Sequence, residues 1–167
     1  MVQVRVAGVA LDAAGQHVIL LKPLDSLPGE GRILPIWIGT QEATSILIAV
    51  EGAIPPRPLA HDLMRSLLDE LGATVDRVEV TRIEEGTFYA EVTITSAADI
   101  HLVDARPSDA IALASRTAAP IWVADDVLAE AGVIDVVTED EAGGDPEENL
   151  EEFKEFLEHV DPEDFRE

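Results

Sequence analysis

The chain of 167 residues contains no cysteine. This absence excludes disulfide bonds, iron–sulfur clusters, thiolate metal sites and cysteine nucleophiles, and it fits a reducing cytoplasm. Aromatic residues make up only 4% of the chain, so few side chains are available to stack on nucleobases. Any metal site must therefore be built from His, Asp or Glu.

Long hydrophobic runs are also missing. The longest aliphatic run, residues 46–50, has five residues, whereas a helix needs about twenty to span a bilayer. No basic segment precedes an apolar stretch at the N-terminus, so the sequence predicts no signal peptide. We expect a cytoplasmic protein that has no contact with a membrane.

Basic residues are scarce: 11 Lys and Arg stand against 34 Asp and Glu, which gives a net charge of −23. Residues 138–167 alone hold 14 acidic and 2 basic residues. Proteins that capture nucleic acid usually carry a basic patch, because Lys and Arg displace the counterions of the phosphates. The charge disfavours passive binding of DNA or RNA, although a divalent cation can bridge acidic side chains to phosphate.

The hydrophobic pattern predicts one domain of the α/β class, an α+β mixed sheet, over residues 1–137. Apolar residues alternate in two predicted hairpins, and apolar spacing of about 3.6 residues predicts three packed helices. We expect strands at 2–11, 17–22, 33–38, 75–83, 88–94, 100–104 and 120–123, and helices at 41–51, 59–71 and 109–116, with a short one at 125–131. Residues 138–167 predict an acidic linker and a C-terminal amphipathic helix.

Several apolar groups carry expectations about packing. Trp37 is expected in the core, and the helix around Ile46 is apolar on nearly all sides, which indicates deep burial or a subunit interface. We therefore expect a homodimer or a larger homo-oligomer. The leucines of the second helix are expected to face the sheet, and an apolar stripe on the tail helix suits docking onto a protein partner or onto the domain. The leucines of the second helix are Leu59, Leu63, Leu67, Leu68 and Leu71, and the stripe is Leu150, Phe153, Leu157 and Val160.

Common phosphate-loop, dinucleotide, zinc-protease and serine-hydrolase motifs are absent from the sequence, and we expect no organic cofactor. Chemistry-bearing residues instead gather between a predicted strand and a helix. Asp104 and Asp109 can hold Mg²⁺ or Mn²⁺ while Arg106 contacts a phosphate. A purely structural alternative exists, in which Ser108 caps the helix, Asp109 favours its dipole and Arg106 pairs with Asp104.

Two further places hold candidate groups. His61 can act as a general base or a metal ligand, oriented by Asp62 or Glu42, or it is simply a surface residue on a first helical turn. Glu42 is either a metal ligand or a carboxylate that stabilises the helix dipole. Arg57 is a candidate for contacting phosphate.

Three segments together resemble the bifunctional nuclease domain family, over about residues 1–137. They are LPIWIG at 34–39 with the Glu-Ala pair at 42–43, Arg-Pro at 57–58 with HDLM at 61–64, and DARPSDAIALA at 104–114. The resemblance implies an α/β fold peculiar to the family and nuclease activity on both RNA and DNA. It carries no assigned catalytic residues. The candidates that match its motif positions are Glu42, His61, Asp62, Asp104, Arg106 and Asp109.

Two hypotheses follow. The first is a nuclease of low sequence selectivity assisted by Mg²⁺ or Mn²⁺, with nucleic acid as its substrate. Its catalytic residues are His61, Asp62, Asp104 and Asp109, its substrate-binding residues are Arg57 and Arg106, and its metal ligands are Glu42, Asp104 and Asp109. The second is a non-catalytic, dimeric binding or regulatory module whose acidic tail recruits a protein partner. A metal-assisted nuclease needs carboxylates close together in a cleft, whereas in a binding module the same carboxylates can lie apart in separate ion pairs.

Overall fold

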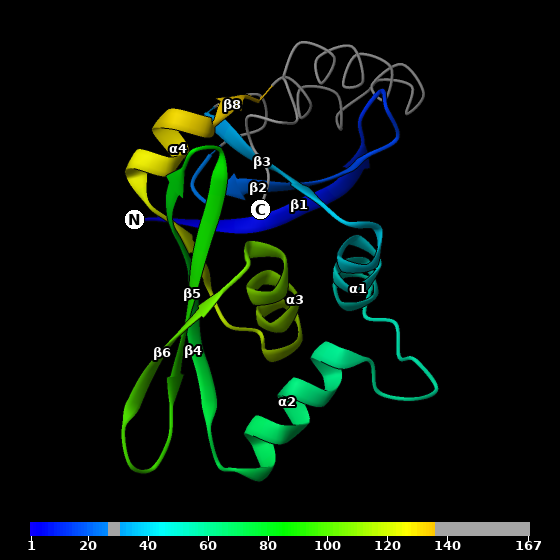
Figure 1. Cartoon of the computed structure of the whole chain (residues 1–167), viewed down its shortest axis with the longest axis vertical. Helices are drawn as coiled ribbons and strands as arrows, with labels where there is room; N and C mark the ends of the chain where they lie inside the picture. Colours follow the sequence, from blue (N-terminus) through cyan, green and yellow to red (C-terminus); the bar gives the residue numbers. More distant parts are fainter. Residues whose placement is uncertain (27–30, 136–167) are drawn as a thin grey trace.

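The computed structural model describes residues 1–26 and 31–135, which form eight strands and four helices (Figure 1). The predicted tail, residues 138–167, lies outside the described residues. The N-terminal elements are β1 (Val2–Leu11), β2 (His17–Pro23), β3 (Arg32–Ile38), α1 (Thr40–Val50), α2 (Ala60–Glu70) and β4 (Thr74–Glu84). They are followed by β5 (Thr87–Thr95), β6 (Ile100–Ala105), α3 (Pro107–Thr117), β7 (Ile121–Val123), α4 (Asp125–Ala131) and β8 (Val133–Ile134).

The eight strands form one mixed sheet in the order β6-β5-β4-β7-β1-β2-β3-β8. Both predicted hairpins are confirmed, since β1 pairs with β2 and β4 with β5 in antiparallel register. Among the described strands, β4 and β7 make the parallel pair. The predicted α/β class with a mixed sheet is therefore confirmed.

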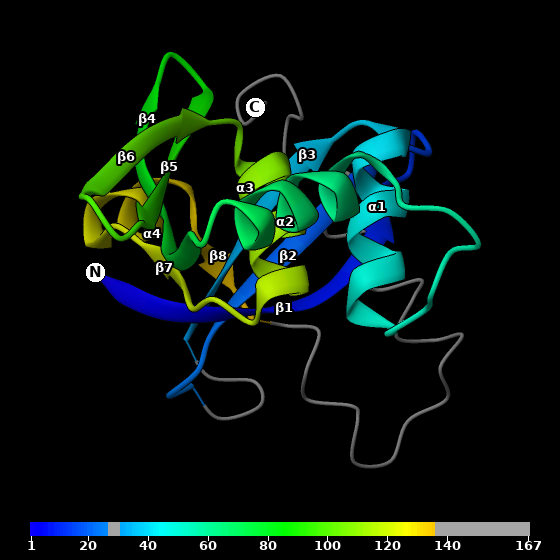
Figure 2. The ribbon, with the colours of Figure 1, turned by 90° about the horizontal axis from the view of Figure 1, so that it is seen from below.

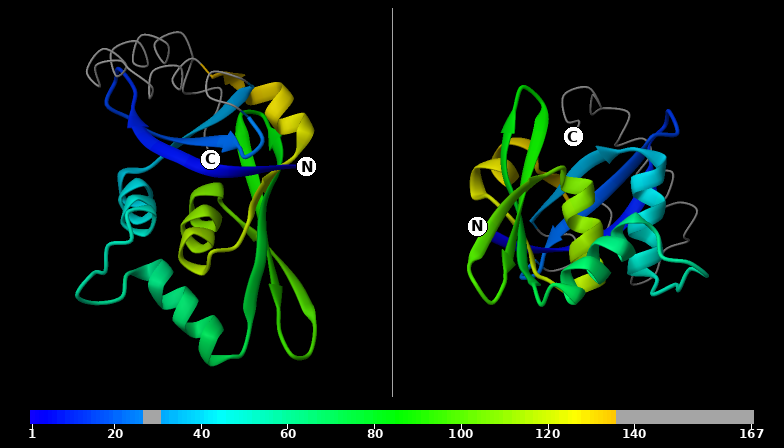
Figure 3. Two further views of the ribbon diagram at one scale, coloured as in Figure 1. Left: turned by 180° about the vertical axis from the view of Figure 1, so that it is seen from behind. Right: turned by 60° about the horizontal axis from the view of Figure 1, so that its bottom comes forward.

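The sheet has two halves that lie at an angle to each other. In Figure 1, β1, β2 and β3 cross the upper part of the molecule, whereas β4, β5 and β6 run down one side. Helices α1, α2 and α3 lie between these halves, and Figures 2 and 3 show the same grouping from other directions. This arrangement brings residues from three distant stretches of the chain together on one side of the sheet.

Strand β2 contributes to the core on both of its faces. Ile19 and Leu21 belong to the large apolar cluster beneath the helices, whereas Val18 and Leu20 join a smaller cluster on the opposite face. The alternation is the period-2 geometry of a strand. Trp37 belongs to the smaller cluster and is 4% exposed, which confirms its expected place in the core.

Helix α2 differs from its prediction. Leu63, Leu67 and Leu71 are 54%, 54% and 78% exposed, so the expectation that this leucine stripe faces the sheet is wrong for most of its members. The helix packs on α3 through its first turn, where His61 is its one buried residue, and only Leu68 approaches the large apolar cluster. Helical periodicity correctly predicted an apolar face on this helix, but it does not show whether that face is buried or exposed to solvent.

Two other expectations have mixed outcomes. Ile46 is fully buried in the large cluster, whereas Val50 at the end of the same helix is half exposed. Ser108 was an expected N-cap of a helix from residue 109, but α3 begins two residues earlier at Pro107, with Arg106 as the N-cap, because proline suits the first helical position.

The described helices are all short. Within residues 1–26 and 31–135, none is long and apolar enough to cross a bilayer.

Candidate functional site

A pocket of about 470 Å³ lies where the first turns of three helices meet. The beginning of α1 lines it from one side, the beginning of α2 from another, and the residues around the start of α3 complete it. Free backbone N–H groups and the helix dipole give each helix N-terminus a partial positive charge. The pocket therefore combines this partial positive charge and the guanidinium of Arg106 with the carboxylates of Glu42 and Asp109. Its lining residues are Thr40, Gln41, Glu42, Thr44, Ser45, Leu59, Ala60, His61, Arg106 and Asp109.

A chain of five polar side chains runs through this pocket. Ser45 Oγ lies 2.8 Å from His61 Nδ1, and His61 Nε2 lies 2.9 Å from Asp109 Oδ1. Asp109 Oδ2 accepts a 2.8 Å hydrogen bond from Arg106 Nε. A guanidinium nitrogen of Arg106, in turn, lies 3.1 Å from Glu42 Oε1. The sequence candidates Glu42, His61, Arg106 and Asp109 thus meet in one place.

The contacts of Asp109 set its charge. Burial raises its pKa, but hydrogen bonds from Arg106 and His61, together with their charges, outweigh burial and hold the pKa of Asp109 below its ordinary value. The carboxylate is consequently ionised near neutral pH and acts only as an acceptor. His61 Nε2 must then carry the hydrogen in this contact.

His61 itself is well enclosed, with 6% of the residue exposed. It sits in the first turn of α2, which Asp62 fixes by accepting a 2.9 Å hydrogen bond from the backbone N–H of Leu59. The other oxygen of Asp62 accepts from Arg116 Nε at 2.7 Å. Asp62 therefore anchors the first turn of the helix that carries His61. Neither of its two hydrogen bonds is made to the imidazole.

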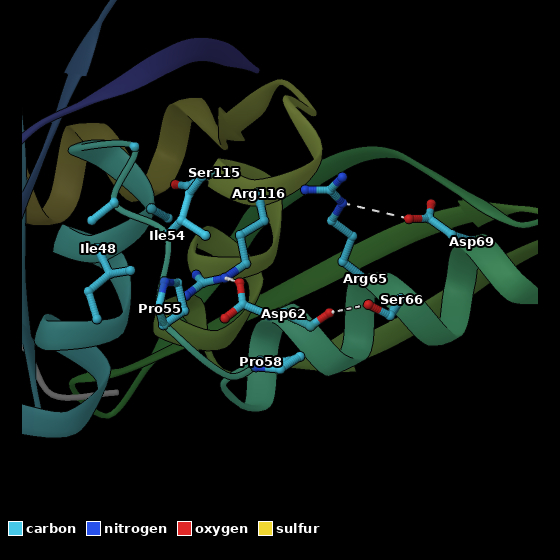
Figure 4. A pocket seen from close by; sticks show the side chains of 13 residues that line it. Ile48, Ile54, Pro55, Pro58, Asp62, Arg65, Ser66, Asp69, Ser115 and Arg116 are labelled. Atoms are coloured by element: carbon cyan, nitrogen blue, oxygen red, sulfur yellow. Dashed lines mark hydrogen bonds and ion pairs between the residues drawn. The ribbon is translucent and has the colours of Figure 1, made fainter.

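Asp62 belongs to a second pocket, of about 520 Å³, between the α1–α2 connector and the later part of α3. Figure 4 shows Arg116 extending toward Asp62, with Arg65 and Asp69 paired farther along α2. Burial raises the pKa of Asp62, but hydrogen bonds from Arg116 and Leu59 outweigh it and lower that pKa below its ordinary value. The second pocket thus contains an ion pair from two helices.

Asp104 and Arg57, like Asp62, lie outside the chain of five. Asp104 is exposed on β6 and lines an apolar groove shared with α2 and β5. Arg57 is exposed on the connector between α1 and α2. Asp104 and Arg57 therefore do not line the pocket that holds His61 and Arg106.

The described residues do not gather metal ligands. Within residues 1–26 and 31–135, no three His, Asp or Glu side chains cluster as a metal site would require. Glu42 and Asp109, two of the predicted ligands, both direct carboxylate oxygens to Arg106. In this arrangement both carboxylates are engaged by the guanidinium of Arg106.

Ser45 is the member of the chain that the sequence analysis missed. It lies within an apolar helix and matches no short catalytic motif. One signal was available, since Glu42 and Ser45 are three residues apart and share a helix face. Its place on the same helix face as Glu42 marks Ser45 as a candidate site residue.

Comparison with known proteins gives three results. The bifunctional nuclease domain matches residues 24–135. An uncharacterized protein of Mycobacterium tuberculosis is 41% identical over 170 residues, which cover 99% of both chains. Bifunctional nuclease 1 of Arabidopsis thaliana is 30% identical over 115 residues, which cover 67% of this chain and 34% of the plant protein.

Proposed function

This chain belongs to the bifunctional nuclease domain family, and on that basis we propose that it hydrolyses phosphodiester bonds of DNA and RNA in the pocket between α1, α2 and α3. The observation that carries the proposal is the hydrogen-bonded chain from Ser45 to Glu42 through His61, Asp109 and Arg106. It combines a proton acceptor, a group that orients it and a cation in one pocket.

Arg106 is the proposed phosphate-binding group. Its side chain is about half exposed, and its guanidinium is held by Asp109 and Glu42 on two sides. A positioned guanidinium stabilises the negative charge that develops on the phosphoryl oxygens in the transition state. The helix N-termini add partial positive charge beside the carboxylates of Glu42 and Asp109.

His61 and Asp109 are the proposed proton-transfer pair. Asp109 fixes the tautomer and orientation of the imidazole through Nε2, which leaves Nδ1 as the basic nitrogen of the neutral ring. Low sequence selectivity is expected, because contacts to phosphate carry no base information. Asp62, Asp104 and Arg57 take no part in the proposed reaction.

The expected assistance by Mg²⁺ or Mn²⁺ stays a prediction. No step of the proposed chemistry passes through a metal, because Glu42 and Asp109 both direct carboxylate oxygens to Arg106. The assay below includes arms with each ion and with a chelator. Loss of activity in the chelator would show that metal is required and would revise the mechanism.

The test is degradation of labelled single-stranded DNA and RNA by highly purified protein in EDTA, Mg²⁺ or Mn²⁺. The variants are His61→Ala and Asp109→Asn, with Asp126→Asn as the matched control, because Asp126 also lies in the first turn of a helix but outside this pocket. We expect the site variants to lose about 100-fold or more of the rate, and the control to keep it.

Equal activity in all variants would point to a contaminating nuclease. Absence of activity in the unmodified protein would instead favour the second hypothesis, a binding or regulatory module.

A further inference from the structure

We propose that Ser45 is the nucleophile of this site and that cleavage proceeds through a covalent Ser45–phosphoryl intermediate. The proposal rests on the proposed function and specifies its chemistry. Nucleophilic catalysis needs a hydroxyl, a base within hydrogen-bond reach of it, and a third group that orients the base. Ser45, His61 and Asp109 meet these three requirements at 2.8 and 2.9 Å.

The direction of the Ser45 hydroxyl differs from that of three other hydroxyl groups in the helices. Thr44, Ser66 and Ser115 each donate to the backbone carbonyl four residues earlier, which is the usual local bond of such residues in helices. Ser45 is directed across to α2 and meets His61 instead. Its side chain therefore makes a bond between helices at the lining of the pocket.

The proton positions in this network follow from Asp109. Its ionised carboxylate only accepts, so Nε2 of His61 carries a hydrogen and donates to it. In the neutral ring Nδ1 is then an acceptor, and Ser45 Oγ donates its proton to Nδ1. The basic nitrogen thus faces the hydroxyl that it would deprotonate. The two ring nitrogens have exchanged roles compared with the common serine-hydrolase arrangement, but an imidazole can transfer a proton at either nitrogen.

The first step forms a bond from Ser45 Oγ to the phosphorus. The serine proton moves to His61 Nδ1 as the oxygen lone pair attacks. The bond from phosphorus to the leaving nucleoside oxygen breaks, its electron pair goes to that oxygen, and His61 returns the proton there. Arg106 stabilises the charge on the non-bridging oxygens. The products are an alcohol and a phosphodiester between Ser45 and the remaining strand.

The second step regenerates the serine. Water gives a proton to His61 Nδ1 and attacks the phosphorus, the Ser45 Oγ–phosphorus bond breaks, and the proton passes to Ser45 Oγ. The net reaction consumes one water and yields a phosphomonoester and an alcohol. Because the nucleophile belongs to the protein, the mechanism has no need of the ribose 2′-hydroxyl, and DNA and RNA should both be cleaved.

Stereochemistry at phosphorus tests the proposal. A chiral phosphorothioate dinucleotide is hydrolysed by the full chain in ¹⁸O-labelled water, and the configuration of the product is determined. Two displacements through Ser45 give overall retention, whereas a single attack by water gives inversion. In parallel, acid-quenched reactions with the diester are digested and analysed by mass spectrometry for a modified peptide containing Ser45.

Variants complete the test. Ser45→Ala should lower the rate about 1000-fold and abolish the adduct, and Ser45→Ala combined with His61→Ala should be no slower than Ser45→Ala alone, because the two groups act as a unit. Ser115→Ala is the matched control, since Ser115 is a partly buried serine of α3 outside this pocket. Ser45→Cys keeps a nucleophile of similar size and should still form an adduct. Circular dichroism and thermal melts verify that each variant is folded.

The outcomes separate the two proposals. Retention together with a Ser45 adduct supports the nucleophile. Inversion, or a folded Ser45→Ala variant that keeps its activity, overturns the nucleophile while leaving the nuclease function in place. A complete lack of hydrolysis by the unmodified protein overturns both.

Discussion

Lys22 Nζ lies 2.6 Å from Asp135 Oδ2, and both side chains are almost completely buried, at 3% and 0% exposure. The pair joins β2 to the residue that follows β8, at the end of the described chain. When a buried charge loses its partner, the free energy lost by removing it from water is no longer offset by the ion pair. This ion pair therefore ties the last described residue into the domain.

We predict that Lys22→Met and Asp135→Asn each lower the free energy of unfolding by about 3–5 kcal/mol, because each leaves an uncompensated polar group or charge buried. Urea denaturation monitored by circular dichroism measures the change. Replacing both residues with apolar ones should recover part of the loss. Arg65→Ala, which breaks the exposed ion pair with Asp69, is the control. It should lower the free energy of unfolding by about 1 kcal/mol or less. A small effect at Lys22 would show that the buried pair contributes little.

The lowered pKa values of Asp62 and Asp109 predict a specific acid dependence of stability. A carboxyl group whose pKa is lower in the folded than in the unfolded state stabilises the fold fully above the unfolded value, which is about 4. That stability is lost as the pH falls through the folded pKa. We expect Asp62→Asn and Asp109→Asn to flatten the loss of stability below about pH 4. Urea titrations from pH 7 to pH 3 measure it, with Asp126→Asn as a control that should follow the unmodified protein.

Gly39 gives a way to disturb the site without disturbing the core. A Cβ atom at this position would lie in contact with a carboxylate oxygen of Glu42. The backbone φ of −71° suits alanine, so Gly39→Ala should change the free energy of unfolding by about 1 kcal/mol or less. The Glu42 carboxylate must move, however, and its contact with Arg106 should weaken.

We expect Gly39→Ala to reduce cleavage by about tenfold while the melting temperature stays nearly constant. Gly8→Ala is the control, because a Cβ there meets nothing within 4 Å. Unchanged cleavage in Gly39→Ala would mean that Glu42 does not position Arg106.

Salt should affect substrate affinity weakly. Affinity for nucleic acid falls with salt in proportion to the number of phosphates that the protein neutralises, and the proposed site offers one guanidinium, that of Arg106. One contact predicts a loss of about fourfold between 50 and 200 mM salt, against 1000-fold or more for typical DNA-binding proteins. Fluorescence anisotropy with a labelled oligonucleotide measures this. A steep dependence would reveal a basic surface other than this site.

The exposed apolar residues of α2 and β6 favour self-association. Met64 and Leu67 of α2, Leu71 just after it and Val103 of β6 line one groove and are each at least 42% exposed. Strand β6 is one edge of the sheet among the described strands and offers unpaired backbone groups beside this groove. An identical surface on a second copy would cover both features.

We predict a homodimer that Leu67→Glu converts to monomer, measured by light scattering at micromolar concentration. Leu11→Glu, at another exposed leucine, is the control and should leave the dimer intact. A monomeric unmodified protein would contradict the prediction.

Local sequence patterns predicted the helices and strands of this fold well, but they predicted poorly which of these elements pack or pair with one another. The alternation of Val2, Val4 and Val6 and the turn at Gly15 fix a hairpin within a short stretch of chain. The pairing of β7 with both β1 and β4 depends on contacts between residues that are far apart in sequence. Such long-range pairing leaves no local periodicity to read.

The same limit applied to the site. Glu42, His61, Arg106 and Asp109 were identified because each lies near the end of a predicted element. Arg106 and Asp109 were grouped within one turn, and Glu42 was one of two groups expected to orient His61. Asp104 was included for its closeness in sequence to Asp109. Both residues line the apolar groove beside α2, but Asp109 also lines the pocket of His61 and Arg106, whereas Asp104 does not. Ser45 lay inside a helix, and only the packing of α1 against α2 shows its partner.

The three residues of β7 are the seam between the two halves of the sheet, since Ile121 pairs with Val4 on one side and Val78 on the other. Helix α1 packs on β1 and β2, α3 packs on β4 and β5, and the bonds from Ser45 through His61 to Asp109 cross between these helices. A ligand that tightens those bonds should also hold the halves together. Amide hydrogen exchange at residues 121–123 would then slow on binding, so a strand that touches no ligand would report occupancy of the site.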